Sequence, residues 1–557
     1  MNQLSHQAHP SQHQLIKENP LRAKMAWGLL ALIFLLITAL YAYLMLKDTL
    51  PILGLLLLPA SWLLFAILSG RLSDRSPLNL PIILLFALLP LSYYISVDKL
   101  LTLPKLYSLV LSIALFFVIL NTIRSKKSIL LALLGLLALI MGVLLIGLVG
   151  VDWSANAFPG LSILTSRIPC LCELMPGLFS GPVVNVNTIG GALTFFSPLL
   201  LSLILDEGSF SIAFIHGYDR RQRLNVVYKI GLVILLLITL FILLLTQSRG
   251  AWLGSMLGLF VVFVAKHRRF LWLIPLLLVL VILAYFTFGE GNIETFLTLI
   301  DTDSDNATLA GRFRAWQATL YMIADFPLTG VGLGTYSRVF TDLYALNAFL
   351  SATTPSIHAH NTLLSVTVDL GFPGLILYVA LLTSFFAVIF HTTRSAHPFI
   401  RVLLLGLGAG MLAHQVFGLT DAYLLGTKLG IIMWIYYGLA AALFTHRHHF
   451  AFRRYHNKYP LSALPSQPAA DSYLAAQQIS GADNDPNAFP DKQNTPGTSK
   501  KTGFLLIALS QLFIFLLTAL AVLALVNINI FLAMVIAILA GISIAMIPGI
   551  ALEKKTK

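Results

Sequence analysis

Charged residues are scarce in this sequence. They make up only 11% of the 557 residues, whereas 58% are hydrophobic, and soluble domains usually contain about 25% charged residues. This composition lies far outside the soluble range. It therefore excludes a separate soluble catalytic domain and predicts a membrane protein.

Cysteine is also rare, since Cys170 and Cys172 are the only two in the chain. Two thiols are too few for a disulfide framework, and their spacing lacks the rest of a metal site. We interpret them as inert thiols.

A concentrated basic surface is lacking too. The net charge of +13 would suit nucleic acid, but the Lys and Arg residues are dispersed among short loops instead of gathered on one folded face. We therefore expect no nucleic-acid partner and look to membrane topology to explain the charge.

What the sequence has in abundance is long apolar runs. Each of about 18 residues or more is long enough to cross a hydrocarbon core of about 30 Å as a helix. The fold class predicted is an all-α, polytopic transmembrane helix bundle, with about twelve core helices and a C-terminal two-helix hairpin. The expected spans are residues 26–46, 51–69, 80–97, 106–122, 128–149, 187–205, 229–246, 250–265, 270–288, 365–390, 399–420, 425–445, 503–526 and 528–550.

The distribution of basic residues tests this list of spans. Short loops rich in Lys and Arg stay in the cytoplasm, and every second loop here is basic, which places the N-terminus inside. The first span shows no small-residue cleavage site, so it is expected to be retained. The basic loops contain Arg22 and Lys24; Arg71 and Arg75; Arg124, Lys126 and Lys127; Arg220, Arg221, Arg223 and Lys229; Lys266, Arg268 and Arg269; Arg394 and Arg401; and residues 446–458.

The same alternation predicts the organisation of the chain. Two long segments lie outside, and the larger is the expected catalytic loop. A Pro-, Ala-, Ser- and Asn-rich segment reads as a disordered cytoplasmic linker to a two-span appendix. The predicted parts are a tail at 1–25, a twelve-helix core at 26–445 with outer loops at 150–186 and 289–364, a basic segment and linker at 446–500, and a hairpin at 501–557.

Three outer features break the expectation that outside loops are poor in positive charge. The first is Arg249, in the turn Ser248-Arg-Gly-Ala-Trp252 between the seventh and eighth spans. An arginine at this boundary either snorkels to the interface or binds an anion.

The second feature is the stretch Gly311-Arg-Phe-Arg-Ala-Trp316, which opens a helix that Pro327 ends. Phe313, Trp316, Leu320 and Ile323 recur at spacings of three and four, which predicts an apolar face lying in the outer leaflet. Arg312 and Arg314 then lie at headgroup depth, where they bind lipid phosphates or a substrate.

The third feature is His358-Ala-His360-Asn361, just before the tenth span. No third outer ligand stands at a diagnostic spacing, so we predict no metal site. Imidazole groups in general titrate near neutral pH and can accept a proton from an acceptor hydroxyl. A structural role for the histidines at the interface is the alternative.

Together the three features suit an anionic lipid head. Guanidinium groups stay charged and match phosphate oxygens with a forked donor, so several near the outer surface suit a diphosphate carried on a lipid. They would stabilise a departing diphosphate in place of a divalent metal, and no cofactor is expected. The glycines of Gly330-Val-Gly-Leu-Gly-Thr-Tyr336 are expected to form a tight turn over the site, with Tyr336 and Arg338 as further substrate-binding candidates.

These motifs, in this order, resemble the O-antigen ligase and polymerase superfamily of membrane glycan transferases. The resemblance covers roughly residues 25–445, and Asn187, in Asn185-Val-Asn-Thr, is similar to a family element at the start of the sixth helix. It implies a GT-C-like glycosyltransferase architecture and an active site on the outer face of the bacterial inner membrane.

The resemblance also implies metal-independent, inverting transfer of a glycan from undecaprenyl diphosphate. Arg249 and Arg312 match the family's diphosphate ligands, and His360 matches its general base, whereas His358 has no equally firm counterpart. The substrate-binding set expected around them is Arg314, His358, Asn361, Trp316, Tyr336, Arg338 and Asn187. The linker and last two helices depart from the family pattern.

Several activities remain open. A ligase passes glycan to lipid A core or another surface anchor, a polymerase joins repeat units, and an oligosaccharyltransferase modifies protein Ser or Thr. Some polymerases carry an outer Arg followed by Gly with ten residues between; none of the outer arginines here does, which favours a ligase. A glycan transporter is the alternative from another class, but transporters place ionisable groups or broken helices near the midplane, and we expect neither here.

Overall fold

The computed structural model describes residues 20–47, 49–151, 153, 184–206, 221–267, 309–344, 358–394, 396–422, 425–447 and 529–553. Its helices are α2 (Pro20–Lys47), α3 (Ile52–Ser69), α4 (Asn79–Ile95), α5 (Lys99–Thr122), α6 (Lys126–Val149), α9 (Val186–Ile204), α10 (Arg221–Leu245), α11 (Arg249–Lys266), α13 (Leu309–Asp325), α14 (Tyr336–Val339), a π-helical turn (Phe340–Tyr344), α15 (Thr362–Thr393), α16 (Pro398–Phe417), a 3₁₀ turn (Lys428–Gly430), α17 (Ile431–Thr445) and α20 (Ile530–Glu553).

The predicted fold class is confirmed. The described residues form a helix bundle without strands, and nine of the described helices are long and apolar enough to cross a membrane. Twelve of the fourteen expected spans coincide with a helix. The spans expected at 270–288 and 503–526, most of the outer loops and nearly all of the linker lie outside the described residues.

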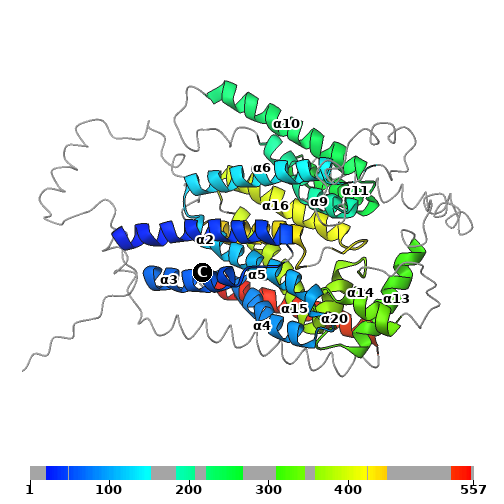
Figure 1. Cartoon of the computed structure of the whole chain (residues 1–557). Helices are drawn as coiled ribbons and strands as arrows, with labels where there is room; N and C mark the ends of the chain where they lie inside the picture. The colour runs from blue at the N-terminus through cyan, green and yellow to red at the C-terminus, as the bar shows by residue number, and fades with distance from the viewer. Residues whose placement is uncertain are drawn as a thin grey trace, which may run out of the picture.

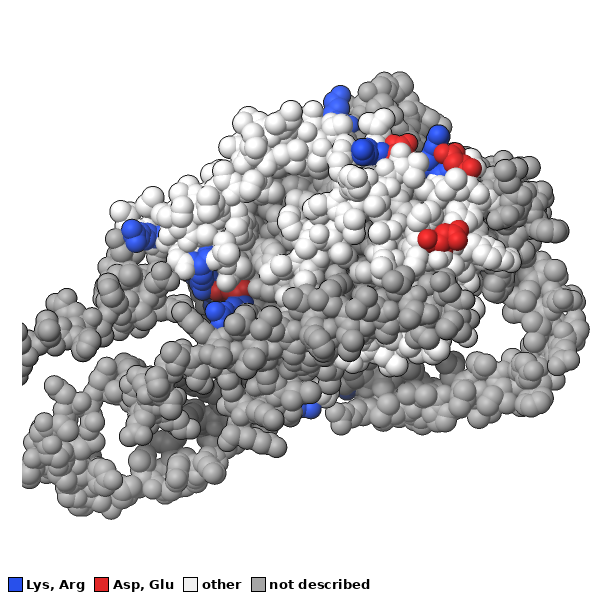
Figure 2. Space-filling view, turned by 90° about the horizontal axis from the view of Figure 1, so that it is seen from below, with Lys and Arg blue, Asp and Glu red and all other residues white. Residues whose placement is uncertain are grey.

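The surface of the bundle suits a lipid environment. Large apolar side chains are exposed along α2 and α3, including Leu32, Leu35 and Leu53. Figure 2 shows a face on which few described side chains are charged. Exposed apolar surface of this extent is unusual for a soluble monomer and is expected against lipid.

The two ends of the bundle separate the charged groups as the topology predicts. At one end the charges of Lys105 and Arg312 act on His358; we call this the His360 end. Arg71 and Arg124, which the sequence places in cytoplasmic loops, meet at Asp74; we call this the Arg124 end. Two of the predicted inside loops therefore meet at one end, away from His358 and His360.

Helix α15 is broken within its apolar stretch. Gly371 has φ 68° and ψ −176°, which interrupts the helical hydrogen bonds. A broken helix in a membrane needs partners for the freed backbone groups, and the loop after α13 supplies them: Val331 N–H donates to Val368 O at 2.8 Å, and Phe372 N–H donates to Pro327 O at 2.8 Å. The expectation of no broken helix is therefore wrong at α15.

The glycine-rich turn predicted at residues 330–336 is the segment that fills this break. Gly330, Gly332 and Gly334 all have positive φ, a conformation that glycine adopts without steric cost. A Cβ on Gly330 would lie 2.6 Å from the backbone of Asp369, and one on Gly332 would lie 2.9 Å from Ser96, the residue that follows α4. The turn therefore ties the outer loop to α15 and α4.

Replacing Gly330 by alanine is expected to destabilise the protein by about 1–3 kcal/mol, because the change combines an unfavourable φ with contact against backbone. Gly28→Ala is the control, since a Cβ there meets nothing within 4 Å and alanine favours the helix. Thermal unfolding in detergent should show a lower melting temperature for the first variant only; equal melting of both would contradict the packing.

Helix α13 differs from its prediction. Its buried residues are Ala315, Ala318, Thr319, Met322 and Ile323, and the helix packs against α15. Ile323 is thus buried by protein, and Trp316 and Leu320 pack against the same core. The described part of this face packs against the bundle instead of lying in the outer leaflet.

The C-terminal helix α20 also packs on α15, and Figure 1 shows the two side by side. Ala533, Ala537 and Ile544 are buried there. A Cβ on Gly541 would lie 2.7 Å from Ile376 O. The last helix, expected to belong to an appendix, is therefore part of the main core.

Candidate active site

The site is built where the start of α15 meets the loop after α16. Thr362 N–H donates to Gly418 O at 2.7 Å. Asn361 caps α15 by accepting from Leu364 N–H at 3.1 Å, and its amide donates to Leu419 O at 3.2 Å. These bonds hold two segments that are about 60 residues apart in sequence, and Asn361 is one of the residues that join them.

This junction brings two histidines against one carboxylate. His358 Nε2 and His360 Nδ1 each lie 3.5 Å from Asp421 Oδ1, and the two rings are 4.3 Å apart between centroids. Asp421 is only 5% exposed. We call these three residues the His–Asp cluster.

Electrostatics keep the carboxylate charged. Burial alone would raise the pKa of Asp421, but its contacts with His360 and His358 and the hydrogen bond from Ala422 N–H together hold it below its ordinary value. Burial lowers the pKa of His358 to about 4; Asp421 opposes this shift, and the neighbouring His360, Lys105 and Arg312 add to it. His358 is therefore neutral near pH 7.

Hydrogen bonds then assign the protons. The backbone N–H of His360 donates to His358 Nδ1 at 3.2 Å. The proton of neutral His358 therefore resides on Nε2, which faces Asp421. If His360 directs its Nδ1–H at Asp421, its Nε2 carries a lone pair. That atom can accept a proton.

The His–Asp cluster contradicts the expectation that no third metal ligand lies near His358 and His360. Asp421 supplies one from a distant segment, with all three ligand atoms within 4.8 Å of one another. Ligation through His358 Nε2 would, however, require the proton to move to Nδ1, where it would meet the N–H of His360. The arrangement therefore suits proton transfer better than metal binding.

Backbone conformation at His360 is unusual. Its φ is +47°, one of two positive values at non-glycine residues in the described part of the chain. The other is Gln247 with φ +52°, just before Ser248 and Arg249. Positive φ at non-glycine residues tends to occur at functional sites, and both instances here adjoin predicted site motifs.

Arg312 lies on α13 close enough to act on His358 electrostatically. Tyr336 helps to place this helix: its hydroxyl contacts Thr319 Oγ1 at 3.1 Å and Ala315 O at 3.4 Å. Burial raises the pKa of Tyr336 to about 12. The buried phenol is therefore a brace between α13 and α14.

Arg249 begins α11 after a three-residue turn, as predicted. Trp252 of this motif donates to Leu243 O at 2.8 Å, closing the turn. Gly250 lies directly against Thr420, the neighbour of Asp421, so that a side chain there would overlap it. The α11 start is thus packed on the segment that carries Asp421, with the Arg249 side chain exposed.

The remaining predicted residues occupy several positions. Asn187 lies in the first turn of α9, its N–H bonded to the Asn185 side chain at 2.8 Å, and α9 meets the Arg249 turn at Gly190. Arg338 pairs with Asp342 at 2.8 Å on an exposed surface. Trp316 packs against the core. Arg314 lies on α13, but its side chain is outside the described part.

Sequence reasoning missed Asp421 and Lys105. Lys105, near the start of α5, lies against Gly334, and its charge acts on both His358 and Asp369. A signal existed for each: Lys105 breaks the same charge rule that singled out Arg249, and Asp421 is an acid in a very short predicted outer loop.

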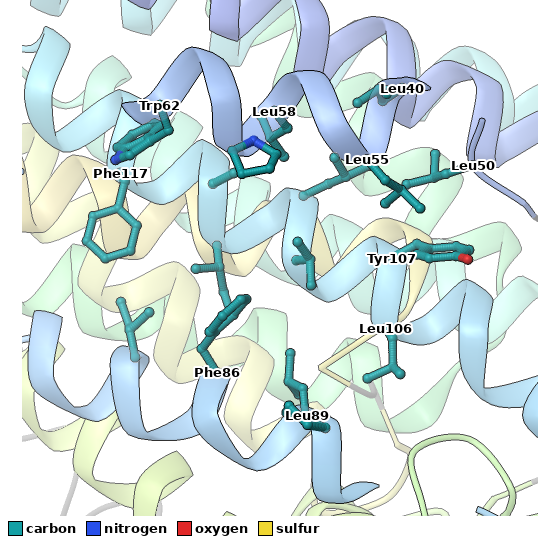
Figure 3. A pocket seen from close by; sticks show the side chains of 18 of the residues that line it. Leu40, Leu50, Leu55, Leu58, Trp62, Phe86, Leu89, Leu106, Tyr107 and Phe117 are labelled. Atoms are coloured by element: carbon teal, nitrogen blue, oxygen red, sulfur yellow. The ribbon is translucent and has the colours of Figure 1, made fainter. Parts of the chain in front are cut away.

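A large apolar cavity lies beside this end of α5. It has a volume of about 830 Å³ and is lined by α2, α3, α4 and α5. Figure 3 shows Leu55, Leu58 and Trp62 on one side and Phe86 and Leu89 on the other. Leu106 and Tyr107, which follow Lys105, also line it.

The neutral state of His358 predicts a pH dependence of stability. Its folded pKa, about 4, lies below the ordinary 6.5, so the unfolded chain binds the proton first as pH falls. The contribution of neutral His358 to the free energy of unfolding is fully present above pH 6.5. It decreases by up to about 3 kcal/mol as the pH falls through 4. The difference in melting temperature between the wild type and His358→Asn should shrink as the pH is lowered. A difference that stays constant with pH would contradict the assignment.

Comparison with known proteins gives one family. The O-antigen ligase family matches residues 234–379, about a quarter of the chain, from α10 into α15. This segment contains Arg249, Arg312, His358 and His360, but neither Lys105 nor Asp421. A comparison with curated proteins found no match. The family match confirms the resemblance to the O-antigen ligase and polymerase superfamily.

Proposed function

The O-antigen ligase family matches the segment of this polytopic chain that contains Arg249, Arg312, His358 and His360. From this match we propose that the protein transfers a finished glycan. The donor is a glycan on undecaprenyl diphosphate, and the acceptor is lipid A core or another surface anchor. The reaction takes place at the His360 end, on the outer side of the bacterial inner membrane.

The observation that carries this proposal is the His–Asp cluster. An ionised Asp421 next to His360 Nδ1 orients the ring and stabilises the imidazolium that forms when Nε2 accepts a proton. A buried carboxylate paired with imidazole in this way is the arrangement of a general base. His358 neighbours the base and, being neutral, adds no repelling charge.

The reaction follows from these groups. The acceptor hydroxyl oxygen attacks the anomeric carbon from the side opposite the diphosphate, forming the new C–O bond with inversion. The bond from that carbon to the diphosphate oxygen breaks, and its electron pair leaves with the diphosphate. The acceptor proton goes to His360. Arg249 and Arg312 bind the diphosphate and stabilise its growing charge without a metal.

Other residues support these roles. Lys105 adds a third positive charge that reaches the same cluster, so we include it among the diphosphate-binding groups. Asn361 and Tyr336 position His360 and Arg312 through the contacts described above. Asn187, Arg314, Trp316 and Arg338 remain proposed contacts for the glycan or carrier.

The apolar cavity is the proposed place for the carrier's polyprenyl chain. It adjoins the turn of α5 that bears Lys105, and its lining is apolar. We expect Ala114→Phe, which fills part of the cavity, to raise KM for the lipid donor severalfold and to leave kcat nearly unchanged. The same change in KM for a donor with a truncated chain would contradict this placement.

The test is reconstitution of the full chain in vesicles with undecaprenyl diphosphate glycan and lipid A core. Mass analysis of the products distinguishes the activities: glycosylated lipid A core identifies a ligase, longer carrier-linked glycan a polymerase, and glycosylated protein an oligosaccharyltransferase. Transfer is expected to persist with a chelator present; its loss on chelation would contradict the metal-free mechanism.

The transporter alternative gains one observation, the broken α15 with buried Asp369. The loop at Val331 and Gly332 already occupies the hydrogen-bonding groups at this break, so the break serves packing. The same vesicles separate the two functions, because a transporter would move the donor across the bilayer and form no glycosylated acceptor.

A further inference from the structure

A second cavity lies at the opposite end of the bundle from His358 and His360. Its volume is about 110 Å³, and it is lined by the beginning of α2 and the ends of α3 and α5. The polar lining residues are Ser69, Arg71, Asn121 and Arg124, and the aromatic ones are Trp27 and Phe65. Two guanidinium groups therefore face one small space.

These arginines are only partly neutralised. Both form ion pairs with Asp74, and the distance from Arg124 Nη2 to Asp74 Oδ2 is 2.5 Å. The Asp74 side chain is only 6% exposed. His446 Nε2 approaches the same carboxylate at 3.3 Å. One carboxylate against two guanidinium groups leaves at least one positive charge in the cluster.

The arginines also retain unused donors. The Nε atoms of Arg71 and Arg124 are both buried without a hydrogen-bond partner. A buried, unsatisfied donor on a charged group is costly and calls for a ligand. Asn121 is not their partner: its oxygen accepts from Asp74 N–H, and its amide donates to Phe117 O and Ser73 Oγ.

The depth of the cavity matches a lipid headgroup. Arg124 follows Lys105 by 19 residues along α5 and its end, roughly 28 Å at the rise of an α-helix, which is close to the hydrocarbon thickness of a bilayer. The Arg124 guanidinium lies 5.6 Å from the Trp27 ring, and tryptophan favours the membrane interface. The cavity is thus at the interface of the leaflet opposite His360.

We propose that this cavity binds the phosphate group of an anionic phospholipid. Phosphate oxygens accept from the two Nε–H groups and neutralise the remaining charge while Asp74 keeps its pairs. Basic pockets between transmembrane helices bind lipid head groups in this way. The acyl chains lie along the exposed apolar side chains of α2 and α3. A free phosphate has the same chemistry and is distinguished by experiment.

The test uses the full chain in nanodiscs of phosphatidylcholine with phosphatidylglycerol, and native mass spectrometry of the lipid that stays bound. The first variant is Arg71→Gln/Asp74→Asn/Arg124→Gln, which removes the site without leaving a lone buried carboxylate. Its net charge change equals that of the control Lys127→Gln, an exposed lysine at the same end. We expect at least tenfold less retained phosphatidylglycerol in the triple variant and wild-type retention in the control.

A second variant covers the case in which the triple variant fails to fold. Arg71→Lys/Arg124→Lys keeps both charges for Asp74 but lacks the Nε–H donors, and we expect severalfold less retained lipid. Inorganic phosphate added to phosphatidylcholine nanodiscs is the second probe. A melting shift with phosphate that exceeds the shift with phosphatidylglycerol would replace the lipid by the free anion and overturn the lipid assignment. Equal retention of phosphatidylglycerol by wild type and both variants would overturn the site itself.

Discussion

Replacing His360 is expected to reduce glycan transfer by about 10²–10⁴-fold, the usual contribution of a general base, while binding of the lipid-linked donor survives. His360→Asn is the sharper variant, because asparagine tolerates the positive φ of this position and cannot accept the proton. His360→Ala adds backbone strain, so a lower melting temperature in that variant alone would reveal a structural component.

The control for this substitution is His267→Ala, which lies at the far end of α11 from Arg249. Its turnover should match the wild type. Transfer rates and donor binding are measured separately in reconstituted vesicles. Turnover of His360→Asn within twofold of the wild type would remove the proposed mechanism.

Replacing Arg312 by alanine is expected to lower kcat/KM for the donor by about 10²–10³-fold, the scale seen when a donor to a developing negative charge is lost. Unlike the His360 variants, this change should also weaken donor binding, since the guanidinium contacts the diphosphate before and during reaction. Arg249→Ala is expected to behave alike. Arg312→Lys should recover only part of the loss, because an ammonium cannot form the forked contact.

Lys99→Ala is the matched control for charge. Lys99 lies at the same end of the bundle, exposed and over the Tyr93 ring, so the variant removes one positive charge without touching the site. A general electrostatic effect would affect both variants and fade with salt. If Arg312→Ala bound donor as tightly as the wild type, or if both variants lost activity equally, the assignment would fail.

The sequence by itself determined the spans and their order. About 20 consecutive apolar residues form a membrane helix for a local reason, since every backbone group must be satisfied within the segment. The same locality explains why the turn before Arg249 and the positive-φ glycines at 330–334 were predictable. The motifs around Arg249, Arg312 and His360 were also readable, because the residues within each are adjacent.

Only the tertiary structure decided which of these motifs meet and with what. Asp421 lies 61 residues beyond His360, and Lys105 lies more than 200 residues before Arg312; their approach depends on how α5, α13, α15 and α16 pack. The hydrogen-bond partners at the Gly371 break come from the loop after α13. The apolar face of α13 packs on α15 instead of lying in lipid. Hydropathy specifies that a helix crosses the membrane but says nothing of its neighbours, because lipid and protein interiors are equally apolar.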